Sequence, residues 1–350
     1  MQSPGKLSGK CRVVLDAMGG DFAPLNEIKG AIDAEKEDKD LEVWLSGDKK
    51  RIEKVLSENN LQFDKNRIVD ASQVVAMSDQ PSQAYKEKQN SSLAIGLRFV
   101  KDGNADAFVS AGNTGAVMLF STLIYRKIKG IDRPTIGTLM PCIGGFCTIF
   151  DAGASVDSKA HHLAEFAVLG SIYAEEMLGK PNPRVGVVSV GEEESKGNEV
   201  SKKALQMIKP LGLNFIGNIE GKDIFKGNVD VAVCDGFTGN ILLKFAEGMS
   251  YLLKYLFKEY ADQGIFNKIK VGLFKSSLKS IFSKLNYENY GGVPLLGVNG
   301  ITIIGHGSSS PLAIKNMIHK AAEAHRKDLL AKLAGAIDSR NIDHNEGNPE

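Results

Sequence analysis

The sequence has little net charge and few cysteines, and both shortages exclude classes of function. Its 350 residues carry 43 lysines and arginines against 42 acidic residues, so no overall positive field attracts nucleic acid. The cysteines show no CxxC pair, and three lie in or beside apolar runs, as reduced core thiols usually do. Reduced thiols are typical of the cytoplasm, where we expect the protein. The cysteines are Cys11, Cys142, Cys147 and Cys234.

Signals for secretion or membrane insertion are also missing. Residues 1–10 are polar and lack an apolar stretch, so we predict a flexible leader rather than a signal peptide. Residues 107–125 carry no charge, but Ser110, Gly112 and Asn113 interrupt the run with polar groups and a turn that are costly in lipid. The run therefore predicts a buried strand, a loop and a buried helix.

Several enzyme signatures are absent. The chain has neither a GxSxG nucleophile turn nor an HExxH zinc helix. Lys196 precedes Gly197, which reverses the Gly-Lys order of a P-loop. The turn from Gly305 to Gly307 lacks the third glycine of a dinucleotide site, because position 310 is serine. These differences weigh against nucleotide binding, and we predict no cofactor.

The sequence makes a weak case for a metal. His161 and His162 are adjacent, so on a helix their side chains diverge by about 100° and do not easily share one ion. Residues 192–194 are glutamates that could hold Mg²⁺, but such a charge run is usually a solvated loop face. We therefore predict no obligatory metal.

Glycine-rich turns that follow short apolar runs are the most informative feature of the chain. Most of them open a helical pattern. A turn of this kind exposes backbone N–H groups at the positive end of a helix, which favours an anion such as phosphate. Because several such turns also carry Ser, Thr, Asn, Lys and His, they suggest one shared site. They cover residues 16–21, 110–115, 191–198, 235–240 and 305–309.

Short apolar runs alternate with longer helical patterns throughout, which predicts a mainly parallel sheet with helices on both faces. The length permits one large domain or two lobes. We predict a single large catalytic α/β domain over residues 11–338, with a helical amphipathic insertion at 245–290. The polar residues 339–350 predict a disordered tail.

The turns and their flanks resemble the bacterial phosphate acyltransferase family of phospholipid synthesis, whose members make acyl phosphate from acyl-carrier-protein thioesters. The resemblance covers residues 13–325, and residues 81–92 match more loosely. Its specific motifs are VLDAMGGDFAP from Val14, SAGNTGAV from Ser110, GEEESKGNE from Gly191, CDGFTGN from Cys234, YGGVPLLGVNG from Tyr290 and HGSS from His306.

The resemblance implies an α/β/α sandwich like that of the isocitrate and isopropylmalate dehydrogenase class. It also implies a homodimer that associates peripherally with the inner face of the cell membrane and uses acyl carrier protein and inorganic phosphate. Three alternatives stay open: a coenzyme A-dependent phosphotransacetylase, a dehydrogenase, and a membrane-docked scaffold without enzymatic activity.

The reaction of this family needs no covalent acyl-enzyme. Phosphate is already a competent nucleophile, and a thiolate is a fairly good leaving group near neutral pH. The protein must desolvate the phosphate, align it with the thioester carbonyl and supply donors for the developing oxyanion.

Lys196 is the strongest catalytic candidate, because it is a cation inside a glycine-rich loop. An ion pair with Glu192, four residues earlier, is the plainer alternative. His306 lies between two glycines, where it could protonate the leaving sulfur or simply belong to a turn. Asp235 and Asn113 complete the predicted catalytic set, with loop organisation and helix capping as their alternatives.

The predicted phosphate-binding residues lie in the same turns and at one helix start. Lys159 is included because a cation at a helix N-terminus opposes the helix dipole and so suggests a nearby anion. Asp16 either orients a catalytic group or organises its loop. The set is Asp16, Gly19, Gly20, Asp21, Ser110, Gly112, Thr114, Gly115, Lys159, Gly197, Asn198, Gly236, Thr238, Gly239, Asn240, Gly307, Ser308 and Ser309.

Residues 264–285 form a basic segment without acidic residues and with an apolar stripe at helical spacing after residue 273. Such helices bind anionic membranes or acidic partners, whereas packing in the core or a dimer is the alternative. The resemblance favours reversible membrane association, with the acidic carrier protein as a second partner. The predicted contact residues are Phe274, Lys275, Leu278, Lys279, Ile281 and Phe282.

Overall fold

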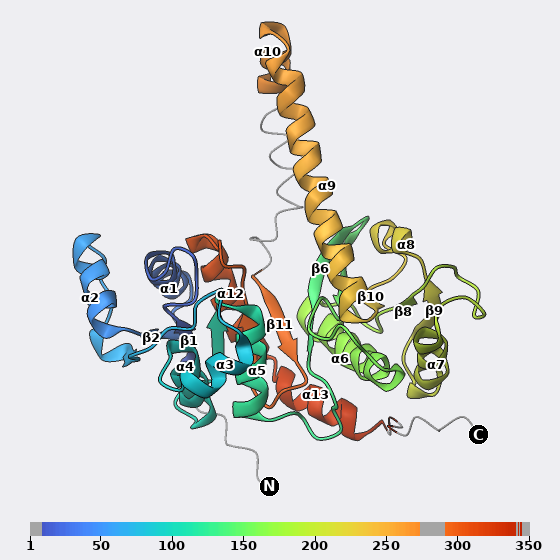
Figure 1. Cartoon of the computed structure of the whole chain (residues 1–350), viewed down its shortest axis with the longest axis horizontal. Coiled ribbons are helices and arrows are strands. Elements are labelled where there is room, and N and C mark those ends of the chain that lie inside the picture. Colours follow the sequence, from blue (N-terminus) through green and yellow to red (C-terminus); the bar gives the residue numbers. More distant parts are fainter. Residues whose placement is uncertain (1–8, 274–290, 341, 343, 345–350) are drawn as a thin grey trace. The chain divides into compact units, whose positions relative to one another are not determined.

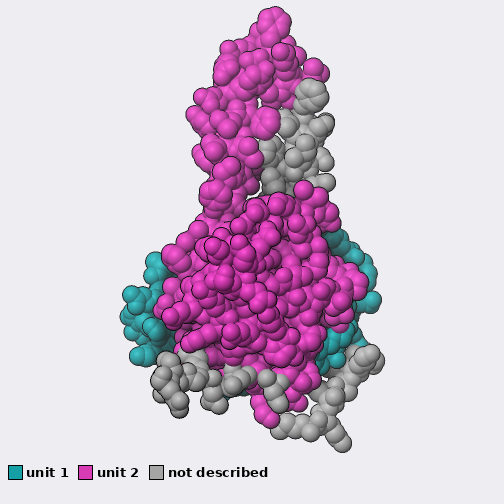
Figure 2. All heavy atoms as spheres, turned by 90° about the vertical axis from the view of Figure 1, so that its right-hand side faces the viewer, with its two compact units in different colours: residues 1–128, 291–334 teal, residues 129–290, 335–350 magenta. Residues whose placement is uncertain are grey.

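A computed structural model describes residues 9–273, 291–340, 342 and 344. The chain divides into two compact units, coloured separately in Figure 2. Unit 1 comprises residues 1–128 and 291–334, and unit 2 comprises residues 129–290 and 335–350. The predicted membrane or carrier-protein contacts lie outside the described residues: Phe274, Lys275, Leu278, Lys279, Ile281 and Phe282.

Unit 1 is built on a mainly parallel sheet (Figure 1). Its strands lie in the order β3-β2-β1-β4-β12-β11, and within this set β11 runs antiparallel to its neighbour β12. The strands are mostly apolar because helices cover both faces of the sheet. They are β1 (Cys11–Asp16), β2 (Leu41–Gly47), β3 (Ile68–Asp70), β4 (Ala107–Ser110), β11 (Val293–Leu296) and β12 (Ile301–Ile304).

Helices α1 and α12 pack on one face of this sheet, where Ile28 and Ile314 join Val13 in one buried cluster. Helix α4 also packs against the sheet, so closely that a Cβ added to Gly96 would lie 2.5 Å from the ring of Phe108. The helical segments are α1 (Leu25–Glu37), α2 (Lys49–Glu58), the 3₁₀ turn η1 (Lys65–Arg67), α3 (Pro81–Glu87), α4 (Ser92–Lys101), α5 (Thr114–Tyr125) and α12 (Pro311–Arg326), followed in the chain by α13 (Leu329–Asp338).

Unit 2 contains a second sheet with the strand order β6-β7-β10-β8-β9. Its strands run parallel except for the β6–β7 pair. The strands of unit 2 are β5 (Thr135–Ile136), β6 (Thr138–Cys142), β7 (Gly145–Phe150), β8 (Val185–Val188), β9 (Phe215–Ile219) and β10 (Val231–Val233). Its helical segments are α6 (Ala160–Leu178), α7 (Glu199–Ile208), η2 (Lys209–Leu211), α8 (Gly221–Lys226), α9 (Gly236–Asp262) and α10 (Ile265–Leu273).

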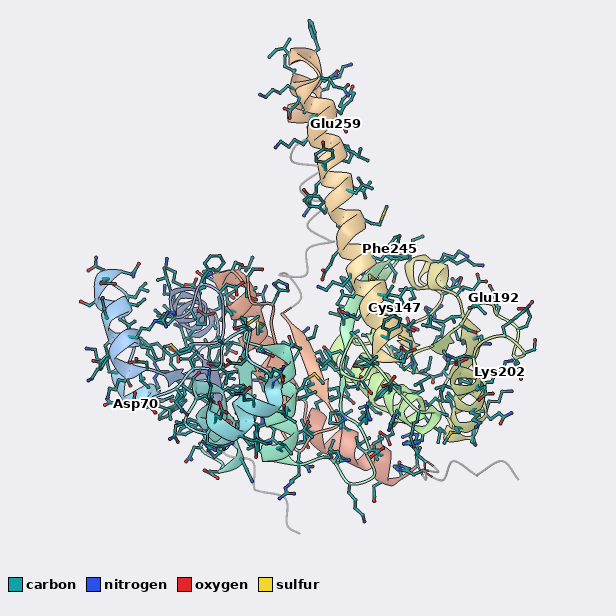
Figure 3. The ribbon with its side chains drawn as sticks, in the orientation of Figure 1. Asp70, Cys147, Glu192, Lys202, Phe245 and Glu259 are labelled. Atoms are coloured by element: carbon teal, nitrogen blue, oxygen red, sulfur yellow. The ribbon has the colours of Figure 1, made fainter. Side chains whose placement is uncertain are left out.

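Helix α9 is largely exposed from Glu247 onward, whereas Leu242 and Ala246 still pack against the core of unit 2. Its buried residues are Gly236 and Gly239, whereas Phe245, labelled in Figure 3, is 66% exposed. Helix α10 packs along it. The predicted start of the insertion at residue 245 falls inside α9, which is continuous. No helix in the described part of the chain combines the length and the apolar character that a membrane span requires.

The predicted α/β fold is confirmed, since both units place helices against mainly parallel sheets. The assignment of residues 11–338 to a single catalytic domain stays a prediction. In each sheet the parallel strands bring their carboxyl ends to one edge, where the glycine-rich turns begin.

Candidate active site

Three of the predicted turns gather in unit 1, after the neighbouring strands β1, β4 and β12. Backbone hydrogen bonds join them: Gly305 N donates to Ser110 O at 2.8 Å, and Asp21 N donates to Gly307 O at 2.8 Å. Three of the five turns therefore lie together in this unit, and one site shared by all five stays a prediction.

Asp16 organises this loop cluster. Its carboxylate accepts hydrogen bonds from Ser110 Oγ at 2.8 Å and from Met18 N at 3.2 Å, and burial raises its pKa. Gly112 N in turn donates to Ser110 Oγ at 3.1 Å. A Cβ on Gly19 would lie 2.6 Å from Asp16 Oδ2, so the close approach of this loop requires glycine. These contacts match the loop-organising alternative for Asp16.

Asn113 and His306 occupy different environments in the same cluster. Asn113 Oδ1 accepts from Ala116 N at 3.0 Å and caps α5, while its Nδ2 donates to Met77 O at 3.0 Å. His306 is exposed, and its Nδ1 lies 2.8 Å from Ser308 Oγ. These contacts show how the two side chains are held, and the catalytic roles of both residues stay predictions.

Glu27 is a residue of this region that sequence reasoning missed. It lies in the first turn of α1 and is 1% exposed, and burial raises its pKa to about 7. A Cβ on Gly20 would collide with its Oε1. A glutamate in a first helical turn is usually explained by the helix dipole at a solvated end, so no pattern in the sequence indicates that this carboxyl is buried.

Unit 2 contains a cavity of about 810 Å³ beside the turns that follow β8 and β10. Its lining includes five of the predicted phosphate-binding or catalytic residues, namely Lys159, Gly197, Asn198, Asp235 and Thr238. An apolar part of the wall is formed by Val156, Leu163, Val188, Val190, Val200 and Phe237. The cavity thus combines helix N-termini and charge with a surface that suits an alkyl chain.

Arg133 also lines this cavity, and sequence reasoning missed it. Its Nη1 donates to Ser155 Oγ at 2.7 Å, and its backbone N donates to the buried carboxylate of Glu165 at 3.2 Å. Ser155 N donates to Asp151 Oδ2 at 2.6 Å, and burial raises the pKa of Asp151. Two buried carboxyl groups therefore position the segments that present Arg133 and Ser155.

Two predicted site residues cap the helices that begin at the cavity. Asp235 accepts hydrogen bonds from the backbone N and from Oγ1 of Thr238, each at 2.8 Å, at the start of α9. Asn198 accepts from Ser201 N at 2.8 Å at the start of α7. Both are caps, which for Asp235 matches the loop-organising alternative. A cap beside a cavity leaves the next backbone N–H groups directed at its contents.

Lys196 is exposed and does not line the cavity. It makes no ion pair with a described residue, and its expected partner Glu192 instead lies 3.9 Å from Lys222 Nζ (Figure 3 labels Glu192). Asn240 is also exposed and lies near Gly153 rather than in the cavity wall. The roles proposed for Lys196 and Asn240 stay predictions.

Comparison with known proteins identifies the family. A family model described as fatty acid synthesis protein matches residues 11–332. Relatives named phosphate acyltransferase from Halothermothrix orenii and Pelotomaculum thermopropionicum are 43% and 44% identical, over 93% and 96% of this chain and 98% of each relative. This chain belongs to the phosphate acyltransferase family.

Solved structures extend the likeness in fold. A phosphotransacetylase from Streptococcus pyogenes has a TM-score of 0.62 and 18% identity, covering 90% of this chain and 94% of its own. The EutD phosphotransacetylase from Staphylococcus aureus has a TM-score of 0.59 and 15% identity, with the same coverage. At these identities the likeness shows the fold alone.

Cys234 lines the cavity of this phosphate acyltransferase family member, but its thiol is poorly suited to nucleophilic attack. Burial raises its pKa well above the ordinary value, so the thiol stays protonated near neutral pH. If phosphate attacks the thioester directly, Cys234→Ala should retain at least about half of wild-type turnover. Alanine variants of the other three cysteines should do the same. Mass spectrometry after mixing with acyl thioester would overturn this prediction by finding an acyl adduct on Cys234.

Proposed function

We propose that this enzyme transfers a fatty acyl group from an acyl-carrier-protein thioester to inorganic phosphate and so supplies acyl phosphate for phospholipid synthesis. The family membership supports acyl transfer to phosphate. The observation that carries the proposal is the cavity of unit 2, where Arg133 and Lys159 share a wall with an apolar surface. Phosphate and an acyl chain are the two substrates that such a wall suits.

The proposed reaction is a direct displacement. A phosphate oxygen forms a bond to the thioester carbonyl carbon, and the carbonyl becomes a tetrahedral oxyanion. When the oxyanion collapses, the C–S bond breaks and the thiolate of the carrier leaves. Arg133 and Lys159 hold the phosphate, and backbone N–H groups at the starts of α7 and α9 donate to the oxyanion. No covalent acyl-enzyme and no metal is needed for these steps.

A coenzyme A-dependent phosphotransacetylase is the second candidate, because the similar solved structures are phosphotransacetylases. The test is a steady-state assay of acyl phosphate formation with palmitoyl-carrier-protein, palmitoyl-coenzyme A and acetyl-coenzyme A, each with inorganic phosphate. A kcat/KM at least tenfold higher with the carrier-protein thioester is the expected result. Faster turnover of acetyl-coenzyme A would instead support the second candidate, and no turnover of any thioester would favour a scaffold.

We also propose that the protein is a cytoplasmic homodimer that binds the inner face of the cell membrane peripherally. The support in the structure is the set of large apolar side chains exposed on α9 and α10, which either a lipid surface or a second subunit could cover. On α10 and at its ends they are Ile265, Phe266, Ile269 and Leu273. The lysines of the basic segment, residues 264–285, suit anionic lipid and the acidic carrier protein equally.

Phe266→Glu should weaken flotation with vesicles of anionic phospholipid by about tenfold or more, because one buried apolar side chain contributes about 1.5–3 kcal/mol. Phe266 is 78% exposed, so the free energy of unfolding should stay near the wild-type value. Asn267→Glu on the same helix adds the same charge without removing an apolar group and is the matched control. A Phe266→Glu protein that floats like wild type but elutes as a monomer would show that α10 serves the dimer instead.

A further inference from the structure

A cluster of metal-binding residue types lies in unit 2, and none of its side chains lines the cavity. Its residues come from the loop before β5, from α6 and from the segment after α13. His161, His162 and Glu165 are buried, at 4%, 1% and 0% exposure. Asp132 and His344 are partly exposed, so one side of the cluster is open to solvent. Its members are Asp132, His161, His162, Glu165 and His344.

The two adjacent histidines reach the same atom, which their divergence on an ideal helix argued against. His161 Nε2 lies 3.2 Å and His162 Nε2 lies 2.8 Å from Asp132 Oδ2. The ring centroids are 4.2 Å apart. Asp132 lies outside α6, and its carboxylate contacts both imidazole rings. The two histidines therefore meet at this carboxylate although they are adjacent on the helix.

His162 is poorly suited to bind a metal through Nε2. Its Nδ1 accepts a hydrogen bond from Lys159 N at 2.9 Å, so in the neutral imidazole the proton is on Nε2. The Nε2–H then donates to Asp132. His162 therefore orients the carboxylate, and the ligands of an ion must come from the other members of the cluster.

We propose that His161, Glu165 and His344 bind a divalent transition-metal ion of the Zn²⁺ class. Their ligand atoms lie within 4.8 Å of one another. His344 Nε2 is 3.6 Å from Glu165 Oε1, and the rings of His161 and His344 stack at 5.2 Å. Two imidazoles and one carboxylate are a donor set that Zn²⁺ binds in proteins, with a fourth position left for water.

The surroundings support these ligands. A histidine that binds a metal through one ring nitrogen usually donates the proton of the other to a carboxylate, and Asp132 is placed to accept it from His161. The Glu165 carboxylate is held by the backbone N of Asp132 at 3.0 Å and of Arg133 at 3.2 Å. The ion would fasten the chain end at His344 to α6 and stabilise the loop that carries Arg133. It takes no part in the proposed acyl transfer.

The test uses the full chain without a histidine tag, stripped with EDTA and then dialysed. Zn²⁺ is titrated against a chromophoric chelator, and thermal melts are recorded with and without Zn²⁺. We expect one ion per chain and a higher Tm with Zn²⁺, because an ion that binds the folded state stabilises it. His344→Ala should lower the affinity at least tenfold and abolish the Tm increase. Its Tm without Zn²⁺ should match wild type, since His344 is partly exposed.

His319→Ala is the matched control, because His319 is also partly exposed and contacts a carboxylate, Glu37, at 3.3 Å in unit 1. It should bind Zn²⁺ like wild type. Wild-type protein that binds no Zn²⁺ would overturn the proposal, as would His344→Ala protein with unchanged affinity. Affinity lost in Asp132→Asn but retained in His344→Ala would place the ion at Asp132, His161 and His162 and overturn the assignment. None of these outcomes depends on acyltransferase activity.

Discussion

Arg133→Ala should lower kcat/KM for acyl phosphate formation by about 100-fold or more. A hydrogen bond to a charged group contributes about 1.5–3 kcal/mol, and the Arg133 guanidinium lies on the wall of the unit 2 cavity, where we propose that it binds the phosphate. Its planar fork can hold phosphate through two hydrogen bonds while Nη1 stays close to Ser155. If Arg133 holds the nucleophile, much of the loss should appear as a higher KM for phosphate.

The fold should survive this change. Arg133 is exposed, and alanine preserves the hydrogen bond from its backbone N to Glu165. The change removes the bond from Nη1 to Ser155 Oγ, but Ser155 stays held through its own backbone N, which donates to Asp151. Tm should therefore stay within a few degrees of wild type. Arg133→Lys should recover part of the activity, because lysine restores the positive charge but not the planar guanidinium that can make two hydrogen bonds to phosphate. Lys202→Ala, an exposed cation on α7 labelled in Figure 3, is the control and should be fully active. An Arg133→Ala enzyme with wild-type kinetics would exclude Arg133 from the phosphate site.

The turns were predictable from the sequence because their chemistry is local. A glycine pair after a buried strand, as at Gly19 and Gly20, signals a backbone that needs close approach, and the structure places Asp16 and Glu27 against that backbone. Helix caps also depend on residues that are close in sequence. Asp235 and Asn198 lie immediately before α9 and α7, and each accepts a backbone N–H three residues later.

The positive charge of the cavity was predictable only in part: Lys159 was expected near an anion from its place at a helix start and lines the wall, whereas Arg133 was not expected there. Lys196 had the local pattern of an anion-binding loop, yet its side chain lies outside the cavity wall. Arg133 lies in a loop without such a pattern. It reaches the wall because Glu165, 32 residues later, accepts its backbone N–H, and because Asp151 fixes its partner Ser155. Such long-range contacts leave no periodicity or spacing in a single sequence, so tertiary structure is required to find them.

Gly239→Ala should lower the free energy of unfolding by about 3 kcal/mol or more, which is the upper part of the range for overpacking a close-packed site. A Cβ at this position would overlap the backbone carbonyl oxygen of Asp151, and a backbone atom cannot move aside as a side-chain end can. Relief would require α9 to shift away from the segment after β7. Because that segment also carries the Asp151 carboxylate that holds Ser155, activity should fall together with stability.

Gly248→Ala provides the matched control on the same helix. Nothing lies within 4 Å of a Cβ built on Gly248, so alanine there should be neutral or stabilise the helix by up to about 1 kcal/mol. Denaturant unfolding of both variants beside wild type measures the difference, which should be about 3–4 kcal/mol. If both variants unfold like wild type, the start of α9 does not pack on Asp151 as described. If Gly239→Ala is destabilised and Gly248→Ala is not, the requirement for glycine at residue 239 is steric. That requirement arises from the close packing of α9 on Asp151, which also brings the N-terminus of α9 to the cavity.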